Sequence, residues 1–324
     1  MATPGKESEN GVYEFPYMRP ESHLTNWEKF QLAVWNSSEN KFLGRDAKSW
    51  GQILMFYSVF YVVLGALFAI CVQGLFLTLD EEKPMWLLDE SLIGTNPGLG
   101  FRPISNRTEE GSLIWYDAKN STSIQKWTEL LDEYLELYLD SSKLEGSVRN
   151  QVICSFGNKP SAEKACAVEV DKWGPCSPEN GYGYNKSQPC FFLKLNRIYG
   201  WEADYYNDPK NLPTDMPQDL KEHIGNLTVE QRNQTWVSCA GENPADRETL
   251  GDTLRYYPTR GFPNYYYPYT NVKGYLSPLV AVQVVRPKTN ILINIECRAW
   301  AKNIIYRGGN QQREGSVHLE LLVD

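Results

Sequence analysis

The sequence is poor in histidine and has no cluster of basic residues. It has 324 residues but only three histidines, and its formal net charge of −8 comes without any clustered run of lysine and arginine. A surface that follows nucleic-acid phosphates needs such a cluster, so we expect no nucleic acid as a partner. The sequence also lacks Asp-x-Asp, a Walker-type glycine loop, Asp-Lys-Thr-Gly and paired Cys-x₂-Cys ligands. We therefore expect no cofactor, no metal site and no catalytic residue.

The histidines do not favour a hydrolase. A hydrolytic triad needs a base placed beside its nucleophile. His318 falls within a strand pattern, and His223 lies in a charged stretch. We expect both of these side chains to be structural or solvated.

One segment is long and apolar enough to cross a membrane. No charged residue occurs from Ser49 to Leu79, and residues 53–79 are almost wholly apolar. This exceeds the roughly 20 residues that span a bilayer core. About fifty residues precede the segment and it is much longer than the apolar part of a cleaved signal peptide, so residues 50–79 are predicted to be a signal anchor.

The charges around this span predict its orientation. Lys41, Arg45 and Lys48 lie just before the span, whereas Asp80, Glu81 and Glu82 follow it with only Lys83 near them. The positive-inside rule then places residues 1–49 in the cytosol as a tail, and the rest of the chain outside it. Trp50 and Trp86 flank the span as expected interface anchors in the membrane lipid.

The span carries features of a helix that packs against another helix. Phe56, Tyr57, Phe60 and Tyr61 form two aromatic pairs one helical turn apart. Gly65 and Ala69 add a pair of small residues that would let a second helix approach closely. Because tyrosine hydroxyls in lipid need hydrogen-bond acceptors, the pattern predicts a helical partner.

The segment after the span is predicted to be a mainly-β ectodomain. Residues 80–120 are rich in Pro, Gly and Asn and are expected to form a stalk and loop, followed by a domain over 121–324. One helix is expected from Ser123 to Leu139. Strand patterns occur at 190–195, 236–239, 279–285, 291–297 and 317–323. Together these elements predict an immunoglobulin-like antiparallel sandwich with one ectodomain helix.

Sequons and cysteines agree with an exoplasmic location of this domain. Asn-x-Ser/Thr occurs after the span at Asn106, Asn120, Asn185, Asn226 and Asn233, which are the expected glycosylation sites. Asn36 also matches the pattern but would be cytosolic. Six of the seven cysteines follow the span, namely Cys154, Cys166, Cys176, Cys190, Cys239 and Cys297. We expect three disulfides among them, with fifteen connectivities open.

A tyrosine-rich segment is the other conspicuous feature. It includes Tyr256 and Tyr257, residues 265–269 and residues 275–283. Tyrosine is enriched at protein interfaces, but it also occurs in cores when its hydroxyl finds a partner at the edge. Composition alone leaves both interpretations open.

At these residues the sequence resembles the β subunit family of the Na⁺/K⁺-ATPase and its H⁺/K⁺-ATPase relative. The resemblance rests on separated motifs in order: Leu43-Gly44-Arg45, Phe56-Tyr57, Phe60-Tyr61, Gly181-Tyr182-Gly183-Tyr184, Pro189-Cys190, residues 194–197, 266–269 and 275–283, and Ile295-Glu296-Cys297. Two departures stand out. Asp46 replaces the threonine usual in the family, and the loop between Cys154 and Cys166 is short.

The resemblance implies a non-catalytic β subunit of a P-type cation pump in the plasma membrane. It would support folding, delivery and K⁺ handling of a catalytic α subunit, beside a small single-span regulatory subunit. The implied disulfides pair Cys154 with Cys166, Cys176 with Cys190, and Cys239 with Cys297. The implied α-subunit contacts are Tyr57, Phe60, Tyr61, Gly65, Tyr266, Tyr267, Tyr269, Tyr275, Leu276, Pro278, Leu279 and Gln283.

Two other functions fit the topology and remain open at this point. A single-span protein with a glycosylated lumenal domain could be a glycosyltransferase or hydrolase. It could also be an adhesion or receptor ectodomain.

Overall fold

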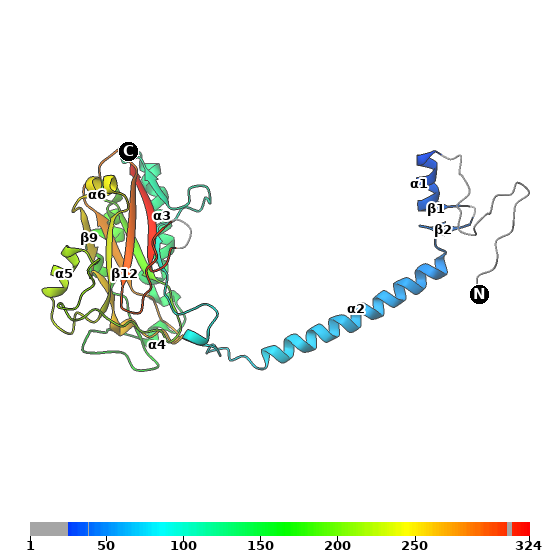
Figure 1. The fold of residues 1–324 in the computed structure, drawn as a ribbon, viewed down its shortest axis with the longest axis horizontal. Helices are drawn as coiled ribbons and strands as arrows, with labels where there is room; N and C mark the ends of the chain where they lie inside the picture. The colour runs from blue at the N-terminus through cyan, green and yellow to red at the C-terminus, as the bar shows by residue number, and fades with distance from the viewer. Residues whose placement is uncertain (1–24, 38, 310–312) are drawn as a thin grey trace, which may run out of the picture. The chain divides into compact units, whose positions relative to one another are not determined.

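The computed structural model describes residues 25–37, 39–309 and 313–324. The first half of the predicted cytosolic tail, including His23, lies outside the described residues. The chain divides into two compact units, Met1–Leu79 and Asp80–Asp324. The first contains the apolar helix, and the second contains the sheets (Figure 1).

The N-terminal unit begins with a short helix and a small hairpin. Helix α1 (Asn26–Val34) starts at a capping box in which Thr25 and Glu28 satisfy each other's backbone N–H groups. Strands β1 (Trp35–Asn36) and β2 (Lys41–Phe42) pair antiparallel after it. The indole N–H of Trp50 donates to the Phe42 carbonyl at 2.8 Å, which ties the hairpin to the next helix.

That next helix, α2 (Ala47–Phe76), is the apolar one: its most apolar 18-residue stretch has a mean hydropathy of 2.4, and it has no buried residue. Its length and composition suit a membrane span, and it starts three residues before the predicted segment. Asp46 caps it by accepting a hydrogen bond from the Ser49 backbone N–H at 3.3 Å. Threonine and aspartate are both good N-cap residues, so the departure at Asp46 preserves the cap that a threonine would supply.

The second unit is built around two sheets that share one apolar core. The five-stranded sheet runs β10 (Gly261–Pro263), β8 (Gln234–Gly241), β12 (Ile293–Trp300), β13 (Ser316–Val323) and β4 (Leu113–Tyr116). The four-stranded sheet runs β3 (Leu99–Arg102), β7 (Cys190–Leu195), β11 (Leu279–Val284) and β9 (Leu254–Tyr257). All five predicted strands are present. Within these two sheets the pairing is antiparallel except between β4 and β13, and outside them β5 (Gln151–Val152) and β6 (Ala165–Cys166) form a short parallel pair.

Helices lie outside these sheets. The longest is α3 (Ser121–Leu139), followed along the chain by α4 (Ser147–Asn150), α5 (Gln218–Gly225) and α6 (Pro244–Leu250). Five 3₁₀ segments complete the unit: η1 (Leu88–Glu90), η2 (Ser141–Lys143), η3 (Val170–Cys176), η4 (Pro178–Lys186) and η5 (Asn264–Tyr266). The expectation of one ectodomain helix is therefore too low, because helices of four to eight residues are too short to show a clear apolar period.

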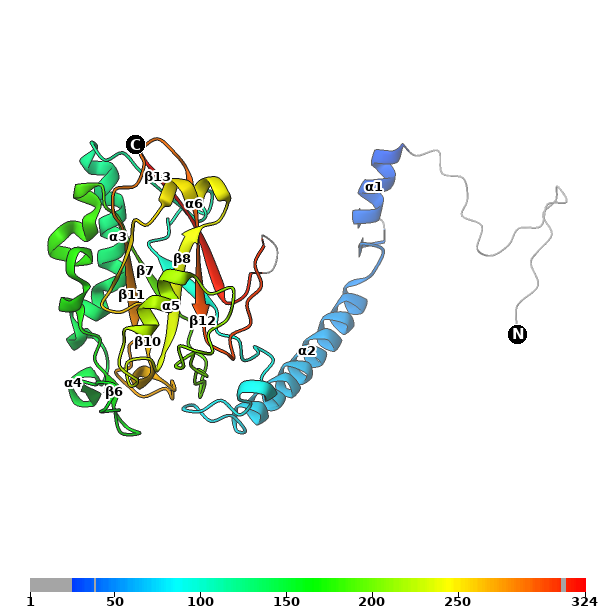
Figure 2. The same cartoon turned by 60° about the vertical axis from the view of Figure 1, so that its left-hand side comes forward.

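The four-stranded sheet is covered on both faces. Every residue of β11 is buried, and so are five of the six residues of β7. Trp173 of η3 packs on Phe192 of β7 with ring centroids 5.0 Å apart, so the 3₁₀ layer covers the face away from the other sheet. Figure 2 shows α3, the strands β7 and β11, and then β8 and β12 in succession.

Helix α3 presents an apolar stripe to this core. Ile124, Trp127, Leu131 and Leu135 are buried, and the Trp127 indole donates to the Trp115 carbonyl of the neighbouring β4 at 2.7 Å. The helix begins two residues before the predicted start because Asn120, not Ser123, is its N-cap.

The outer face of the five-stranded sheet has its own small core. Trp236 and Trp300 are paired neighbours on β8 and β12 and are both buried. Helix α5 covers them with Leu220 and Ile224, while Met216 packs at the edge. The five-stranded sheet is therefore also shielded on its outer face around Trp236 and Trp300.

The predicted stalk contributes to the sheets. The compact unit already begins at Asp80, and β3 and β4 both fall within residues 80–120. The two strands have four residues each and lie at sheet edges, between Pro- and Gly-rich stretches. Such short runs carry little alternation, so the composition of their surroundings dominates the sequence pattern.

Three disulfides are present: Cys154–Cys166, Cys176–Cys190 and Cys239–Cys297. These are the pairs that the family resemblance implies. Cys239 and Cys297 face each other on the adjacent strands β8 and β12, so this bond lies within one sheet. Immunoglobulin domains instead link their two sheets by a disulfide, so this fold departs from that pattern.

Gly183 provides a test of the η4 conformation. Its φ is +76°, and a Cβ there would overlap the backbone carbonyl oxygen of Gln188. Gly200 has a similar φ of +72° with open space around it. We expect Gly200→Ala to cost about 1–2 kcal/mol from the left-handed backbone alone, and Gly183→Ala to cost several kcal/mol more through the clash.

The measurement is the thermal unfolding of the two purified full-length variants beside the parent protein. Equal losses of stability in the two variants would show that the contact with Gln188 does not constrain the loop.

Candidate partner-contact surfaces

The apolar helix α2 carries an aromatic surface that nothing in the described chain covers. Phe56 stacks on Phe60 with centroids 6.3 Å apart, and Tyr57 stacks on Tyr61 at 6.2 Å. Their exposed fractions lie between 47% for Phe60 and 63% for Phe56. The predicted aromatic pairs therefore exist, and they pre-order four rings along one side of the helix.

Small residues leave room next to this surface. A Cβ built on Gly65 or on Gly74 would meet nothing within 4 Å. Both positions are therefore open to close approach from outside the chain, which in a membrane is how helices bring their backbones together. In the described part of the chain, all four aromatic side chains are exposed and the space beside Gly65 is open.

The tyrosine-rich segment of the ectodomain is mostly internal. Of its eight predicted contact residues, Tyr269 and Tyr275 are half-buried, whereas the buried ones are Tyr266, Tyr267, Leu276, Pro278, Leu279 and Gln283. Leu279 and Gln283 lie on the central strand β11. Between the two interpretations that composition left open, the structure places most of these side chains in the core.

Aromatic packing and a few hydrogen bonds hold this segment in place. The Tyr266 hydroxyl donates to the Ala167 carbonyl at 3.1 Å. Tyr267 packs edge-on against Trp201 with centroids 5.9 Å apart, and Tyr269 lies 4.9 Å from Tyr275. Burial raises the pKa of Tyr266 and of Tyr267 well above the usual range, so both hydroxyls stay protonated and neutral.

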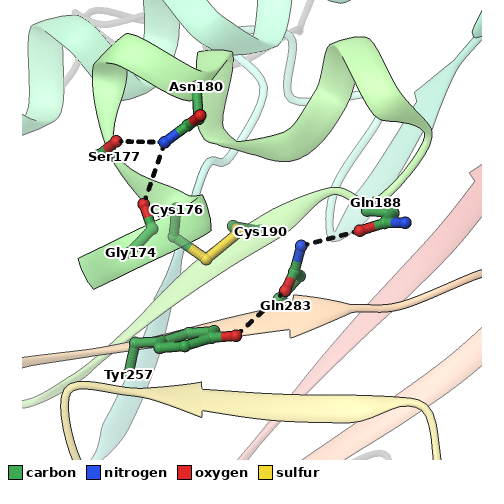
Figure 3. Close-up of a disulfide and its surroundings, with 8 residues drawn as sticks. All are labelled: Gly174, Cys176, Ser177, Asn180, Gln188, Cys190, Tyr257 and Gln283. Carbon is green, nitrogen blue, oxygen red and sulfur yellow. Dashed lines mark hydrogen bonds between the residues drawn. A yellow bond between two sulfur atoms is a disulfide. The ribbon is translucent and has the colours of Figure 1, made fainter. Parts of the chain in front are cut away.

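Gln283 has an internal role that its sequence motif does not reveal. Its side-chain amide donates to the Gln188 side chain at 3.2 Å, and its carbonyl accepts from the Tyr257 hydroxyl at 3.4 Å (Figure 3). Gln188 lies two residues before Cys190, whose disulfide with Cys176 is next to this pair. Gln283 therefore links β11 to β9 and to the loop that the Cys176–Cys190 disulfide closes.

The predicted sequons lie at the surface of the domain. Asn106, Asn120, Asn185 and Asn226 are exposed, and Asn233 is half-buried. The Asn120 side-chain oxygen accepts a hydrogen bond from the Thr122 N–H at 3.0 Å and so caps α3. Exposure makes these sites accessible to glycosylation, and their occupancy stays a prediction.

The two ectodomain histidines are held by structural contacts. His223 packs edge-on against Trp236, and burial, followed by the nearby Arg260, lowers its pKa. It is therefore neutral at physiological pH. His318 lies between two carboxylates, with Nδ1 2.6 Å from Glu242 and Nε2 3.4 Å from Glu320. In the described part of the chain, no three His, Cys, Asp or Glu side chains form a metal-binding group.

Sequence reasoning missed the long-range partners of the tyrosines. Trp201 lies 66 positions before Tyr267, and Ala167 lies 99 positions before Tyr266. Nothing in the local pattern connects them. The only available signal was the density of aromatic residues itself, which does not distinguish a core from an interface.

Comparisons with known proteins bear on the whole chain. The family model for the sodium/potassium ATPase beta chain matches residues 20–319. The chain is 47% identical to sodium/potassium-transporting ATPase subunit beta-2 of Drosophila melanogaster over the full length of both, and 46% identical to subunit beta-1 of the same organism over 97% of each. It is 29% identical to human subunit beta-2, over 93% of this chain and 95% of the human one.

Tyr266 and Tyr267 form a matched pair for testing the internal role of the segment. Tyr266→Phe removes the hydrogen bond to Ala167 and should destabilise the fold by about 0.5–1.5 kcal/mol. The buried Tyr267 hydroxyl has no hydrogen-bond partner among the described residues, so Tyr267→Phe should be neutral or stabilising. Unfolding of the two variants by denaturant measures the difference, and the reverse order would contradict the assigned contacts.

Proposed function

Because the chain belongs to the sodium/potassium ATPase beta chain family, we propose that it is the non-catalytic β subunit of a sodium/potassium-transporting P-type ATPase. Its role is to support the folding, membrane delivery and K⁺ handling of a catalytic α subunit. The observation that carries this proposal is the family match over residues 20–319. It favours this function over the glycosyltransferase, hydrolase and adhesion alternatives.

The uncovered face of α2 is the proposed contact with the α subunit inside the membrane. Tyr57, Phe60 and Tyr61 would pack against α-subunit helices, and Gly65 would allow their close approach. The rings are already stacked on one another, so little side-chain freedom is lost when a partner covers them. The tyrosine hydroxyls gain acceptors that lipid tails lack.

Outside the membrane, we place the contact on the accessible part of the tyrosine-rich segment. Tyr269 and Tyr275 are half-buried and would meet an extracellular loop of the α subunit. The buried residues of the segment, such as Tyr266, Tyr267 and Gln283, lie beneath this surface and hold its shape. The Cys176–Cys190 disulfide and the Gln283 hydrogen bonds make that support stiff.

The orientation and location follow from the same proposal. The chain would be a type II protein of the plasma membrane with residues 80–324 outside, where disulfides persist and sequons are read. A small single-span regulatory subunit and membrane lipid are further proposed partners around α2. We also propose that the two-sheet ectodomain is an immunoglobulin-like sandwich in its layering, from which it departs by closing its largest disulfide loop within one sheet.

The proposed mechanism needs no chemistry from this chain. A rigid external domain that binds the conformers of the α subunit with unequal affinity shifts the equilibrium between them. The size of that shift equals the difference between the two binding free energies. Such a domain changes K⁺ handling by the pump without touching the ions.

Copurification tests the proposal directly. Extraction of the full-length chain from its native membrane in mild detergent should yield a stoichiometric complex with a larger subunit, and ATP hydrolysis by the complex should require both Na⁺ and K⁺. Replacing Tyr57 and Tyr61 by Leu should weaken the complex by about 1–2 kcal/mol per lost hydroxyl contact. Recovery of the chain as a self-sufficient monomer would refute the proposal.

The matched control replaces Met55 and Val62 by Leu. These residues are 70% and 71% exposed, and they lie across the helix from Tyr57 at about 100° per residue. The control should leave the yield of the complex unchanged. Equal loss in both double variants would show that the aromatic face is not the contact.

Glycan mapping tests the orientation. Mass spectrometry of the native protein should find N-linked glycans only after the span, at exposed positions such as Asn106 and Asn226, and none at Asn36. The reason is that the sugar-transferring machinery acts only on the exoplasmic side. A glycan on Asn36 would reverse the proposed topology.

A further inference from the structure

A cleft of about 690 Å³ opens between helix α3 and the edge of the four-stranded sheet. Tyr134 and Tyr138 of α3 form one side, and Arg102 at the end of β3 and Lys194 on β7 form the other. Its volume lies within the range of about 300–1,000 Å³ that is typical of small-molecule sites. Tyr275 in the cleft lining also belongs to the ectodomain surface proposed above for contact with the α subunit, so the test below uses both the free chain and its native complex.

Three cations line this cleft in a chain that is acidic as a whole. They are Arg102, Lys194 and Arg197. Among the described residues, none of the three makes an ion pair with a carboxylate, and the lone acid in the lining is Glu133 at the exposed surface of α3. The cleft therefore concentrates positive charge against a net charge of −8. Positive charges gathered in a concave surface attract and concentrate anions.

The two arginines are held in position by tyrosine rings. The Arg102 guanidinium lies 5.5 Å from the centre of the Tyr134 ring, and the Arg197 guanidinium lies 5.2 Å from that of Tyr269. Cation–π contacts of this kind limit the motion of the side chain without using its N–H donors, and Arg102 donates one of them to the Phe101 carbonyl at 3.2 Å. A guanidinium that is already oriented loses less entropy when it binds a carboxylate.

The repulsion between these charges affects the pKa of Lys194. Burial lowers its pKa, and the neighbouring Arg197 and Arg102 lower it further. An anion in the cleft would remove the repulsion between the three side chains and favour the charged form of Lys194. The three cations thus repel one another across the cleft, and a bound anion would reduce that repulsion.

Apart from Glu133 and the polar Ser105, Asn106 and Ser277, the rest of the lining is apolar or aromatic. It includes Leu130, Leu137, Leu144 and Leu276, beside the rings of Tyr134 and Tyr138. An inorganic anion would leave these surfaces without a contact. We propose that the cleft binds a small organic anion, in which one carboxylate meets Arg102, Lys194 and Arg197 and an apolar or ring-shaped body packs on the tyrosines and leucines.

Benzoate is a suitable probe because it carries one carboxylate on a flat apolar ring, and benzamide is its uncharged counterpart. Both are titrated into the full-length chain in detergent, alone and in its native complex, and binding is followed by saturation-transfer NMR. We expect benzoate to bind and benzamide to bind at least about tenfold more weakly, since charge-assisted hydrogen bonds are the stronger ones. Equal binding of the two would overturn the proposal.

Substitutions locate the binding. Lys194→Met and Arg197→Gln should each weaken benzoate binding by about five- to twentyfold, whereas Lys194→Arg, which keeps the charge, should retain it. Lys288→Met is the matched control, because Lys288 is an exposed cation outside the cleft lining. Unchanged binding in the cleft variants, or an equal loss in the control, would overturn the proposal.

Two further outcomes would also overturn it. Binding to the free chain that disappears in the native complex would show that an acidic segment of the partner occupies the cleft. Asn106 lies at the cleft, so binding seen only after enzymatic removal of N-glycans would show that a glycan fills it. Binding in the glycosylated complex supports the small-anion site.

Discussion

The ectodomain depends on one constraint, which is that strands β7 and β11 must be covered on both faces. Their sequences are nearly continuous apolar runs, so neither face can be left in water. The five-stranded sheet covers one face, and η3, η4 and α3 cover the other. The Cys176–Cys190 disulfide joins this outer layer to β7 itself, so the cover and the covered strand are covalently connected.

The same constraint explains what could be predicted from the sequence. Strands β7, β11 and β13 and helices α2 and α3 are long enough for their apolar pattern to identify them. Helices α5 and α6 span about two turns each, so tertiary contacts determine whether they form. Helix α5 forms because Leu220 and Ile224 cover Trp236 and Trp300. Strands β3 and β4 lie at sheet edges and pair with segments that are distant in the sequence. The residues within the two strands do not indicate that pairing.

The candidate contact surfaces divide in the same way. The aromatic pairs of α2 follow from helix geometry alone, so the sequence was sufficient to place them. The ectodomain tyrosines depend on where Ala167 and Trp201 come to lie, and that is fixed by the fold of the whole unit. The cationic cleft shows the same limit, because Arg102 and Lys194 are brought together only by the pairing of β3 with β7.

The two ends of the Asn120 side-chain amide are available for different purposes. Its oxygen fixes the first turn of α3, while its nitrogen is the atom that would carry an N-linked sugar. Attachment of the sugar would leave the capping acceptor in place. The helix would then act as a rigid mount for the carbohydrate, and the backbone of α3, not the free rotation of a side chain, would set the direction in which the sugar leaves the surface.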